Sequence, residues 1–202
     1  QPENGRLYGA RATLRHRAGL IAPALDDLNR ALAAKPDDPQ LLNNRGFVLL
    51  SLQRLDEAAL DLERAIEINT ESSSACNNRG LVSLARGKHR DAIDWFNKAL
   101  YRQPEYVDAL NNRGFAWMEL GRLENAYADL NQALRISPKY VNALHNRGLL
   151  KARAGEREAA VLDFTEAMLL DPLNPKYYEH RGQVYERLGR TEESRADQKM
   201  VE

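Results

Sequence analysis

The sequence has very little of several features that define common classes of protein. It contains one cysteine, so neither an internal disulfide nor a cysteine-based metal site can form. A single cysteine fits a reducing compartment such as the cytoplasm without establishing it. No apolar run approaches the roughly 18 residues that a membrane-spanning helix needs. No glycine-rich phosphate loop, Ser/His/Asp set or cysteine nucleophile motif is present, so we expect no enzymatic activity and no cofactor.

Charge of one sign is also missing, because 29 Lys and Arg residues balance 29 Asp and Glu residues. This balance gives no bulk attraction to nucleic acid or to an acidic membrane surface. The exception is the segment from Gly5 to Leu25, which contains several basic and no acidic residues. The chain starts at Gln1 and shows no charged-then-apolar leader, which predicts a processed chain or a segment of a longer one.

What the sequence does contain is a repeat. The tetrapeptide Asn-Asn-Arg-Gly, or His-Asn-Arg-Gly in one copy, recurs along the chain. Its glycine returns every 34 residues, at Gly46, Gly80, Gly114 and Gly148, and the variant Glu-His-Arg-Gly continues the spacing at Gly182. A fixed period of this length indicates an architecture of stacked repeats. The flanking apolar residues recur at intervals of three and four, which predicts helices around the motif.

Placing these glycines at position 8 divides the chain into six repeats. Their bounds are 5–38, 39–72, 73–106, 107–140, 141–174 and a shorter 175–202. Positions 20 and 27 are almost always alanine, position 15 is usually glycine, and position 32 is usually proline. Glycine at position 15 predicts a turn between two antiparallel helices, A and B, and proline at position 32 ends the second. We expect glycine at position 8 to face alanine at position 20.

This pattern resembles the tetratricopeptide repeat family over essentially the whole chain. The resemblance implies an all-α fold, a right-handed α-solenoid of about six 34-residue helix-turn-helix repeats, forming one domain over residues 1–202. It also implies that helix A of each repeat lines a concave groove. Proteins of this family are typically protein-interaction scaffolds rather than enzymes.

An arginine precedes each glycine, at position 7, and an aspartate occupies position 23 in five repeats. In an antiparallel hairpin that turns near position 15, these two positions lie level with each other. We therefore predict a structural ion pair within each repeat. The third repeat is the exception, because Trp95 occupies position 23 there.

The groove side of helix A carries asparagines and large apolar residues. The asparagines are Asn44, Asn78, Asn112 and Asn146 at position 6, with Asn43, Asn77 and Asn111 at position 5. The apolar residues at position 9 are Phe47, Leu81, Phe115 and Leu149. An asparagine amide can both donate to and accept from a peptide unit whatever its sequence. These eleven residues are thus predicted to bind an extended peptide or a partner protein.

Several alternatives stay open. The apolar stripe could pack on neighbouring A helices or on a second copy of the chain, making a homo-oligomer. Nucleic-acid binding through the basic first helix is a weaker alternative, because the later helices are charge-balanced. A metal site among His145, Glu179, His180 and Glu186 would use suitable ligand types, but their spacing follows from the repeat, so we expect solvated polar groups and no metal.

Overall fold

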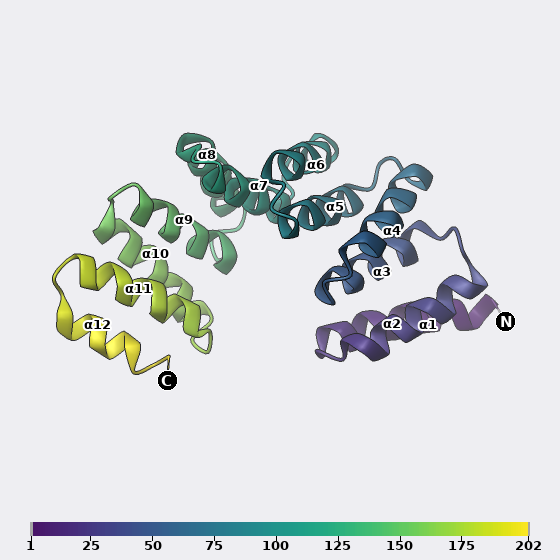
Figure 1. The fold of residues 1–202 in the computed structure, drawn as a ribbon, viewed down its shortest axis with the longest axis horizontal. Helices are drawn as coiled ribbons and strands as arrows, with labels where there is room; N and C mark the ends of the chain where they lie inside the picture. The colour runs from purple at the N-terminus through teal and green to yellow at the C-terminus, as the bar shows by residue number, and fades with distance from the viewer. Residues whose placement is uncertain (1, 202) are drawn as a thin grey trace. The chain divides into compact units, whose positions relative to one another are not determined.

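The computed structural model describes residues 2–201, including all their side chains except those of residues 2–4 and 6. Over residues 2–201 the chain forms twelve α-helices and no β-strand (Figure 1). The prediction of an all-α fold is therefore confirmed. The chain divides into two compact units, residues 1–104 and 105–202, and each unit contains three of the predicted repeats.

Each repeat consists of an odd-numbered A helix followed by an even-numbered B helix. In the first unit these helices are α1 (Pro2–Arg17), α2 (Ile21–Ala34), α3 (Pro39–Ser51), α4 (Leu55–Ile68), α5 (Ser73–Ala85) and α6 (His89–Arg102). In the second unit they are α7 (Val107–Glu119), α8 (Leu123–Ile136), α9 (Val141–Arg153), α10 (Arg157–Leu170), α11 (Pro175–Arg187) and α12 (Thr191–Gln198).

The ends of these helices follow local sequence signals. The side chain of Asp38 accepts hydrogen bonds from the backbone N–H groups of Gln40 and Leu41 at the start of α3. The turn between the A and B helices needs a residue with positive φ, which is glycine in five repeats. The second repeat has Gln53 at this position, and its φ of 60° shows that the turn keeps its shape without the glycine.

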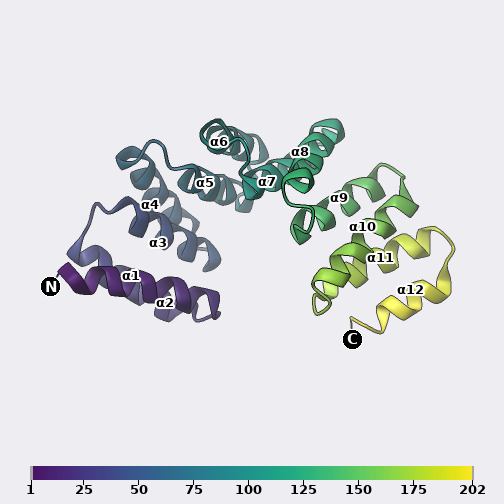
Figure 2. The ribbon, with the colours of Figure 1, turned by 180° about the vertical axis from the view of Figure 1, so that it is seen from behind.

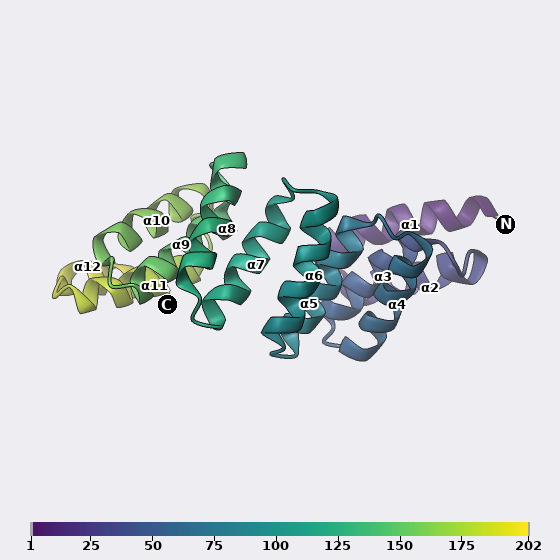
Figure 3. The same cartoon turned by 90° about the horizontal axis from the view of Figure 1, so that it is seen from above.

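The two helices of a repeat pack closely on each other, and each B helix then packs on the next A helix of its unit. The views in Figures 2 and 3 show this for α1 and α2 in the first unit and for α7 and α8 in the second. Within each unit, neighbouring A helices also contact each other, whereas neighbouring B helices in the described chain do not. The A helices therefore lie on the inner side of each stack, and we call this side the A-helix face.

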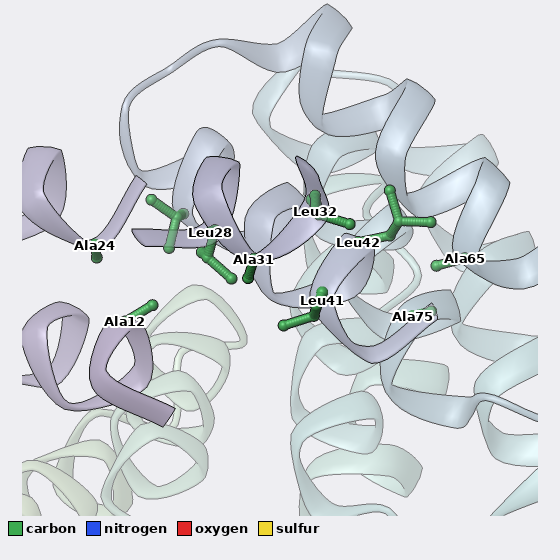
Figure 4. Close-up of a cluster of buried hydrophobic side chains, with 10 residues drawn as sticks. Ala12, Ala24, Leu28, Ala31, Leu32, Leu41, Leu42, Ala65 and Ala75 are labelled. Carbon is green, nitrogen blue, oxygen red and sulfur yellow. The ribbon is translucent and has the colours of Figure 1, made fainter. Parts of the chain in front are cut away.

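The core is made of small and branched apolar side chains at the interfaces between these helices. One cluster of ten fully or nearly buried residues joins α1, α2, α3, α4 and α5, and Figure 4 shows nine of them with labels. Ala12 of α1 lies beneath Ala24 and Leu28 of α2, while Leu41 and Leu42 carry the cluster into the next repeat. Each unit is thus held together by a core that continues from one repeat to the next.

Glycine at position 8 has a different partner from the one predicted. A Cβ atom on Gly46 would lie 2.6 Å from Leu62 Cγ, and one on Gly80 would lie 2.5 Å from Phe96 Cε1. Leu62 and Phe96 occupy position 24, so the side chain at position 24, rather than alanine at position 20, fills the space above the glycine. The helices approach closely enough that alanine at position 20 contributes only its backbone oxygen, 3.2 Å from a Cβ on Gly46.

Alanine at Gly80 should therefore destabilise the first unit. The new methyl group would overlap the ring of Phe96, which is fully buried and cannot move aside. Overpacking of this kind costs about 1–3 kcal/mol, and the higher helix propensity of alanine offsets somewhat less than 1 kcal/mol. We expect Gly80→Ala to lower the free energy of unfolding by about 1–2 kcal/mol, measured by urea denaturation. Gly182→Ala is the matched control, because the nearest atom to a Cβ at this position would be 3.4 Å away; an equal loss there would contradict the explanation.

The predicted ion pairs between positions 7 and 23 are present. Each arginine donates from Nε and Nη2 to both carboxylate oxygens of its aspartate, with all ten distances between 2.6 and 2.9 Å. The pairs are Arg11–Asp27, Arg45–Asp61, Arg113–Asp129, Arg147–Asp163 and Arg181–Asp197. The remaining nitrogen of Arg45, Arg147 and Arg181 also bonds to the preceding repeat, at Asn29, Asn131 and Thr165 respectively.

The third repeat differs as predicted. Arg79 turns to Glu63 of the preceding repeat, with Nε 2.9 Å from Oε1, and also donates to Ser83. Its guanidinium lies over the ring of Trp95, 5.3 Å from the centroid. An arginine at position 7 therefore keeps a structural role even where its own repeat supplies no aspartate.

Candidate functional site

The A-helix face brings the predicted site residues of each unit together in rows. In the first unit Asn43 and Asn44 lie on α3 while Asn77 and Asn78 lie on α5. In the second unit Asn111 and Asn112 lie on α7 and Asn146 lies on α9. The role of these residues in binding stays a prediction, but the structure separates the two asparagine positions by burial and by partner.

The asparagines at position 5 are buried. Asn43, Asn77 and Asn111 are 4–6% exposed, whereas the asparagines at position 6 are half-buried. A buried side-chain amide must form hydrogen bonds within the protein, because leaving it unpaired is costly. The asparagines at position 5 are therefore parts of the repeat packing, and the side chains on the surface of this face belong to position 6.

Position 6 donates to position 5 of the preceding repeat. Asn78 Nδ2 lies 2.9 Å from Asn43 Oδ1, and Asn146 Nδ2 lies 2.8 Å from Asn111 Oδ1. We call such a bond a rung. Each rung ties one A helix to the next and occupies one donor of the exposed asparagine. The oxygen of Asn146 accepts no hydrogen bond within the described residues, so the side of the amide that faces outward is an acceptor.

A histidine pair replaces the last rung of the second unit. Nε2 of His145 on α9 lies 2.9 Å from Nδ1 of His180 on α11, so one nitrogen donates and the other accepts. The ring of His145 also packs against Tyr177 and Phe164, with centroid distances of 5.1 and 5.8 Å. Burial and the positive charge that His180 can carry lower the pKa of His145 to about 4. Burial lowers the pKa of His180 as well. The pair is therefore neutral at pH 7.

The apolar residues at position 9 lie beside the position-6 asparagines. Phe47 is 37% exposed, and Leu81, Phe115 and Leu149 are half-buried. The ring of Phe47 contacts that of His16, with a centroid distance of 5.1 Å. Leu149 packs against a buried cluster that includes Phe164 and Tyr185. Each residue thus supports the repeat packing with one side and leaves the other on the A-helix face.

The first two A helices differ from the others because no rung joins them. Asn44 occupies position 6 of the second repeat, but position 5 of the preceding repeat is Gly9, which has no side chain to accept a hydrogen bond. A pocket of about 220 Å³ lies here between α1 and α3. It is lined by Ala12, Thr13, His16, Arg17, Leu28, Asn44, Phe47 and Val48. Thr13, His16 and Arg17 are not among the residues that the sequence selects. Gly9, where the asparagine row breaks, lies one helical turn before Thr13 and does not line this pocket.

The described residues give little support for metal binding, membrane insertion or nucleic-acid binding. No group of three or more His, Cys, Asp or Glu side chains in residues 2–201 is placed to hold a metal ion. No helix of the described chain combines the length and apolar character needed to cross a bilayer. Two arginines of the basic first helix, Arg11 and Arg15, both bind Asp27, and the Arg11 bonds lower the pKa of that carboxyl. These bonds neutralise part of the positive charge that suggested nucleic-acid binding.

Comparison with known families agrees with the repeat read from the sequence. A family model described as "Tetratricopeptide repeat" matches residues 10–75 and 145–201, which is more than half of the chain. The chain belongs to the tetratricopeptide repeat family. Further models of the family match residues 73–106 and 116–155, so matches extend over nearly the whole length. No curated protein matches the sequence.

Solved structures of tetratricopeptide repeat proteins share the fold. PilW, a type IV pilus biogenesis factor, is 20% identical with a TM-score of 0.86, over 98% of this chain and 91% of its own. TTC0263, a thermophilic protein from Thermus thermophilus, is 18% identical with a TM-score of 0.81, over 89% and 98%. YrrB, a protein "with an unusual peptide-binding site", is 21% identical with a TM-score of 0.62, over 86% and 90%. The fold is thus an all-α solenoid of tetratricopeptide repeats, a class of protein-interaction scaffold.

Proposed function

We propose that this chain is a non-catalytic scaffold that binds an extended peptide segment of a partner protein on its A-helix face. The observation that carries the proposal is the row of half-exposed asparagines beside a stripe of half-exposed apolar residues, both on the inner side of each stack. Asparagine is a poor helix former, so its recurrence at position 6 needs a reason beyond helix formation. The rung accounts for one N–H of the amide and leaves the rest of the group on the surface. The peptide-binding site of YrrB supports the same class of ligand for a protein of this fold.

The spacing of the A helices suits an extended peptide. Packed helices lie roughly 10 Å apart, whereas an extended chain advances about 3.3 Å per residue. Asparagines at position 6 of adjacent repeats would therefore meet about every third residue of the ligand. Because each rung uses one N–H of Asn78 or Asn146, we expect the oxygens of these amides to accept hydrogen bonds from peptide N–H groups. The neighbouring side chains at position 9 would receive apolar side chains of the peptide.

Selection from a library of random linear peptides tests this function. Peptides of about twelve residues are long enough, since they extend over about 40 Å. We expect the wild-type chain to enrich peptides with an apolar residue at regular spacing. The variant Asn78→Ala/Asn112→Ala should bind an enriched peptide roughly tenfold to hundredfold more weakly, because each lost hydrogen bond is worth about 0.5–1.5 kcal/mol. Affinity is measured by fluorescence anisotropy with a labelled peptide.

Two controls make this result specific. Leu60→Ala/Leu162→Ala removes two exposed leucines from the B helices and should leave the affinity unchanged. Thermal unfolding of each variant comes first, because Asn78 also forms a rung to buried Asn43 and its loss lowers stability. If the asparagine variant is folded and keeps full affinity, while the leucine variant loses it, the ligand binds the B helices and the proposed function is wrong. A chain that enriches no peptide but forms a dimer through the A-helix face would favour self-association.

A further inference from the structure

The gap between α1 and α3 combines an unused hydrogen-bond donor with an apolar pocket. Asn44 Nδ2 has no partner among the described residues, because Gly9 stands where the other rungs have their acceptor. The oxygen of Asn44 already accepts a hydrogen bond from Gln40 Nε2 at 2.9 Å, so the nitrogen is the part of this amide that a ligand can use as a donor. The closed rungs of the first and second units, Asn78–Asn43 and Asn146–Asn111, show what this nitrogen does when an amide oxygen is within reach.

The pocket beside Asn44 has the size of one side chain. Its volume of about 220 Å³ lies below the roughly 300–1,000 Å³ of ordinary small-molecule sites. Ala12, Leu28, Phe47 and Val48 supply apolar walls, and all of them except Phe47 also belong to the buried cluster of Figure 4. Its walls are therefore fixed by the core of the first unit. No acidic side chain lines the pocket, whereas His16 and Arg17 stand among its lining residues. An apolar occupant fits this lining, and a lysine or arginine side chain does not.

Thr13 provides a hydrogen-bond acceptor in the same pocket as the donor nitrogen of Asn44. Its hydroxyl donates to the backbone oxygen of Gly9 at 3.2 Å, so its lone pairs are the part that a ligand can use. The pocket thus presents one amide donor, one hydroxyl acceptor and an apolar wall. A peptide unit followed by an apolar side chain matches these three features, since it carries one C=O, one N–H and one apolar group.

We propose that the pocket between α1 and α3 anchors the bound peptide by a single large apolar residue, such as leucine or methionine. Its side chain fills the pocket, and an adjoining peptide carbonyl accepts the hydrogen bond from Asn44 Nδ2, completing the missing rung. The anchor rests on the proposed function, and it deepens that function by naming a position of the ligand that an enclosed pocket selects for a large apolar side chain.

The proposal is tested with a small probe that contains only the predicted group. N-acetyl-leucine N-methylamide has one leucine side chain between two peptide units, and N-acetyl-glycine N-methylamide is the same molecule without the side chain. NMR titration of the ¹⁵N-labelled chain follows the side-chain amide of Asn44 and the backbone amides of α1 and α3. We expect the leucine probe to shift the Asn44 side-chain signals saturably, at millimolar concentration, and the glycine probe to bind about tenfold more weakly.

Two variants of the pocket and one control variant make the test specific. Asn44→Asp keeps the shape of the side chain but replaces the donor by an acceptor, and should weaken the probe about tenfold. Asn125→Asp, on the exposed surface of α8, makes the same change of charge elsewhere and should have no effect. Thr13→Phe should fill the pocket and abolish binding while leaving thermal unfolding nearly unchanged, because Thr13 is exposed.

The outcomes separate the anchor from the proposed function. Saturable shifts confined to α1, α2 and α3, and lost in Asn44→Asp, support the anchor. Shifts that are absent, spread over both units, or unchanged in Asn44→Asp overturn it. If an enriched library peptide binds Asn44→Asp as tightly as wild type but loses affinity in Asn78→Ala/Asn112→Ala, the anchor is wrong and the proposed function stands. If the probe binds as expected but no library peptide is enriched, the pocket stands and the proposed function fails.

Discussion

Replacing Arg45 with leucine is expected to lower the free energy of unfolding by about 2–3 kcal/mol, the largest effect of any single substitution considered for this chain. Both oxygens of the buried Asp61 carboxylate accept from Arg45, at 2.6 and 2.8 Å, and no other group in the described residues donates to them. Arg45→Leu would leave this negative charge buried without a partner. Breaking a fully buried ion pair costs about 3–5 kcal/mol. The expected loss lies at or below the lower end of this range, because the arginine keeps some contact with solvent.

A double variant and a control distinguish this explanation from a loss of packing. Arg45→Leu/Asp61→Leu removes both charges and should recover most of the stability, because a buried ion pair contributes little beyond what apolar side chains of similar size provide. Arg54→Leu breaks a pair of the same geometry with Glu57 at the surface, where both side chains are exposed, and should change stability little. Urea denaturation measures all three. The explanation fails if the double variant is as unstable as Arg45→Leu.

The histidine pair of the second unit should make stability depend on pH between about 6.5 and 4. The folded state holds the pKa of His145 at about 4, whereas an unfolded histidine titrates near 6.5. Between these values the unfolded chain binds a proton that the folded chain does not, so stability falls as pH decreases. Allowing for partial exposure of the ring, we expect a loss of about 2 kcal/mol across this interval.

One neighbouring charge acts in the same direction as burial, and another opposes it. Lys176 on α11 lies close enough for its charge to lower the pKa of both histidines, while Glu179 opposes this effect at His180. Phe164 of α10 and Tyr177 of α11 contribute ring contacts without charge. Asp27, whose pKa is lowered by Arg11, loses its stabilising charge mainly below its ordinary value of 3.8, so it contributes little across this interval.

The asparagine rung elsewhere in the second unit provides a natural replacement for the histidine pair. His145→Asn/His180→Asn rebuilds the asparagine rung found between Asn146 and Asn111, and should abolish the loss of stability between pH 6.5 and 4. His16→Asn, which changes a histidine in the first unit, should leave the pH dependence intact. Thermal unfolding measured from pH 7 to pH 4 compares the three proteins. An unchanged pH dependence in the double variant would show that the histidine pair is not its source.

The sequence alone determined the features that depend on a single repeat. The 34-residue period, the helix pairs and the ion pairs between positions 7 and 23 could all be read from it. The ion pairs were predictable because the turn at position 15 fixes which residues of the two helices lie opposite each other. Positions 7 and 23 are 16 residues apart, as Arg45 and Asp61 are. Trp95 could be recognised as the exception for the same reason.

Only the tertiary structure decided how one repeat meets the next. The rung from Asn78 to Asn43 joins residues 35 apart, and its length depends on the stacking of two A helices, which no local pattern specifies. The burial of asparagines at position 5 and the contact of position 24 with glycine at position 8 follow from the same stacking. So does the pocket beside Asn44, because side chains of α1, α2 and α3 enclose it only when these three helices pack together.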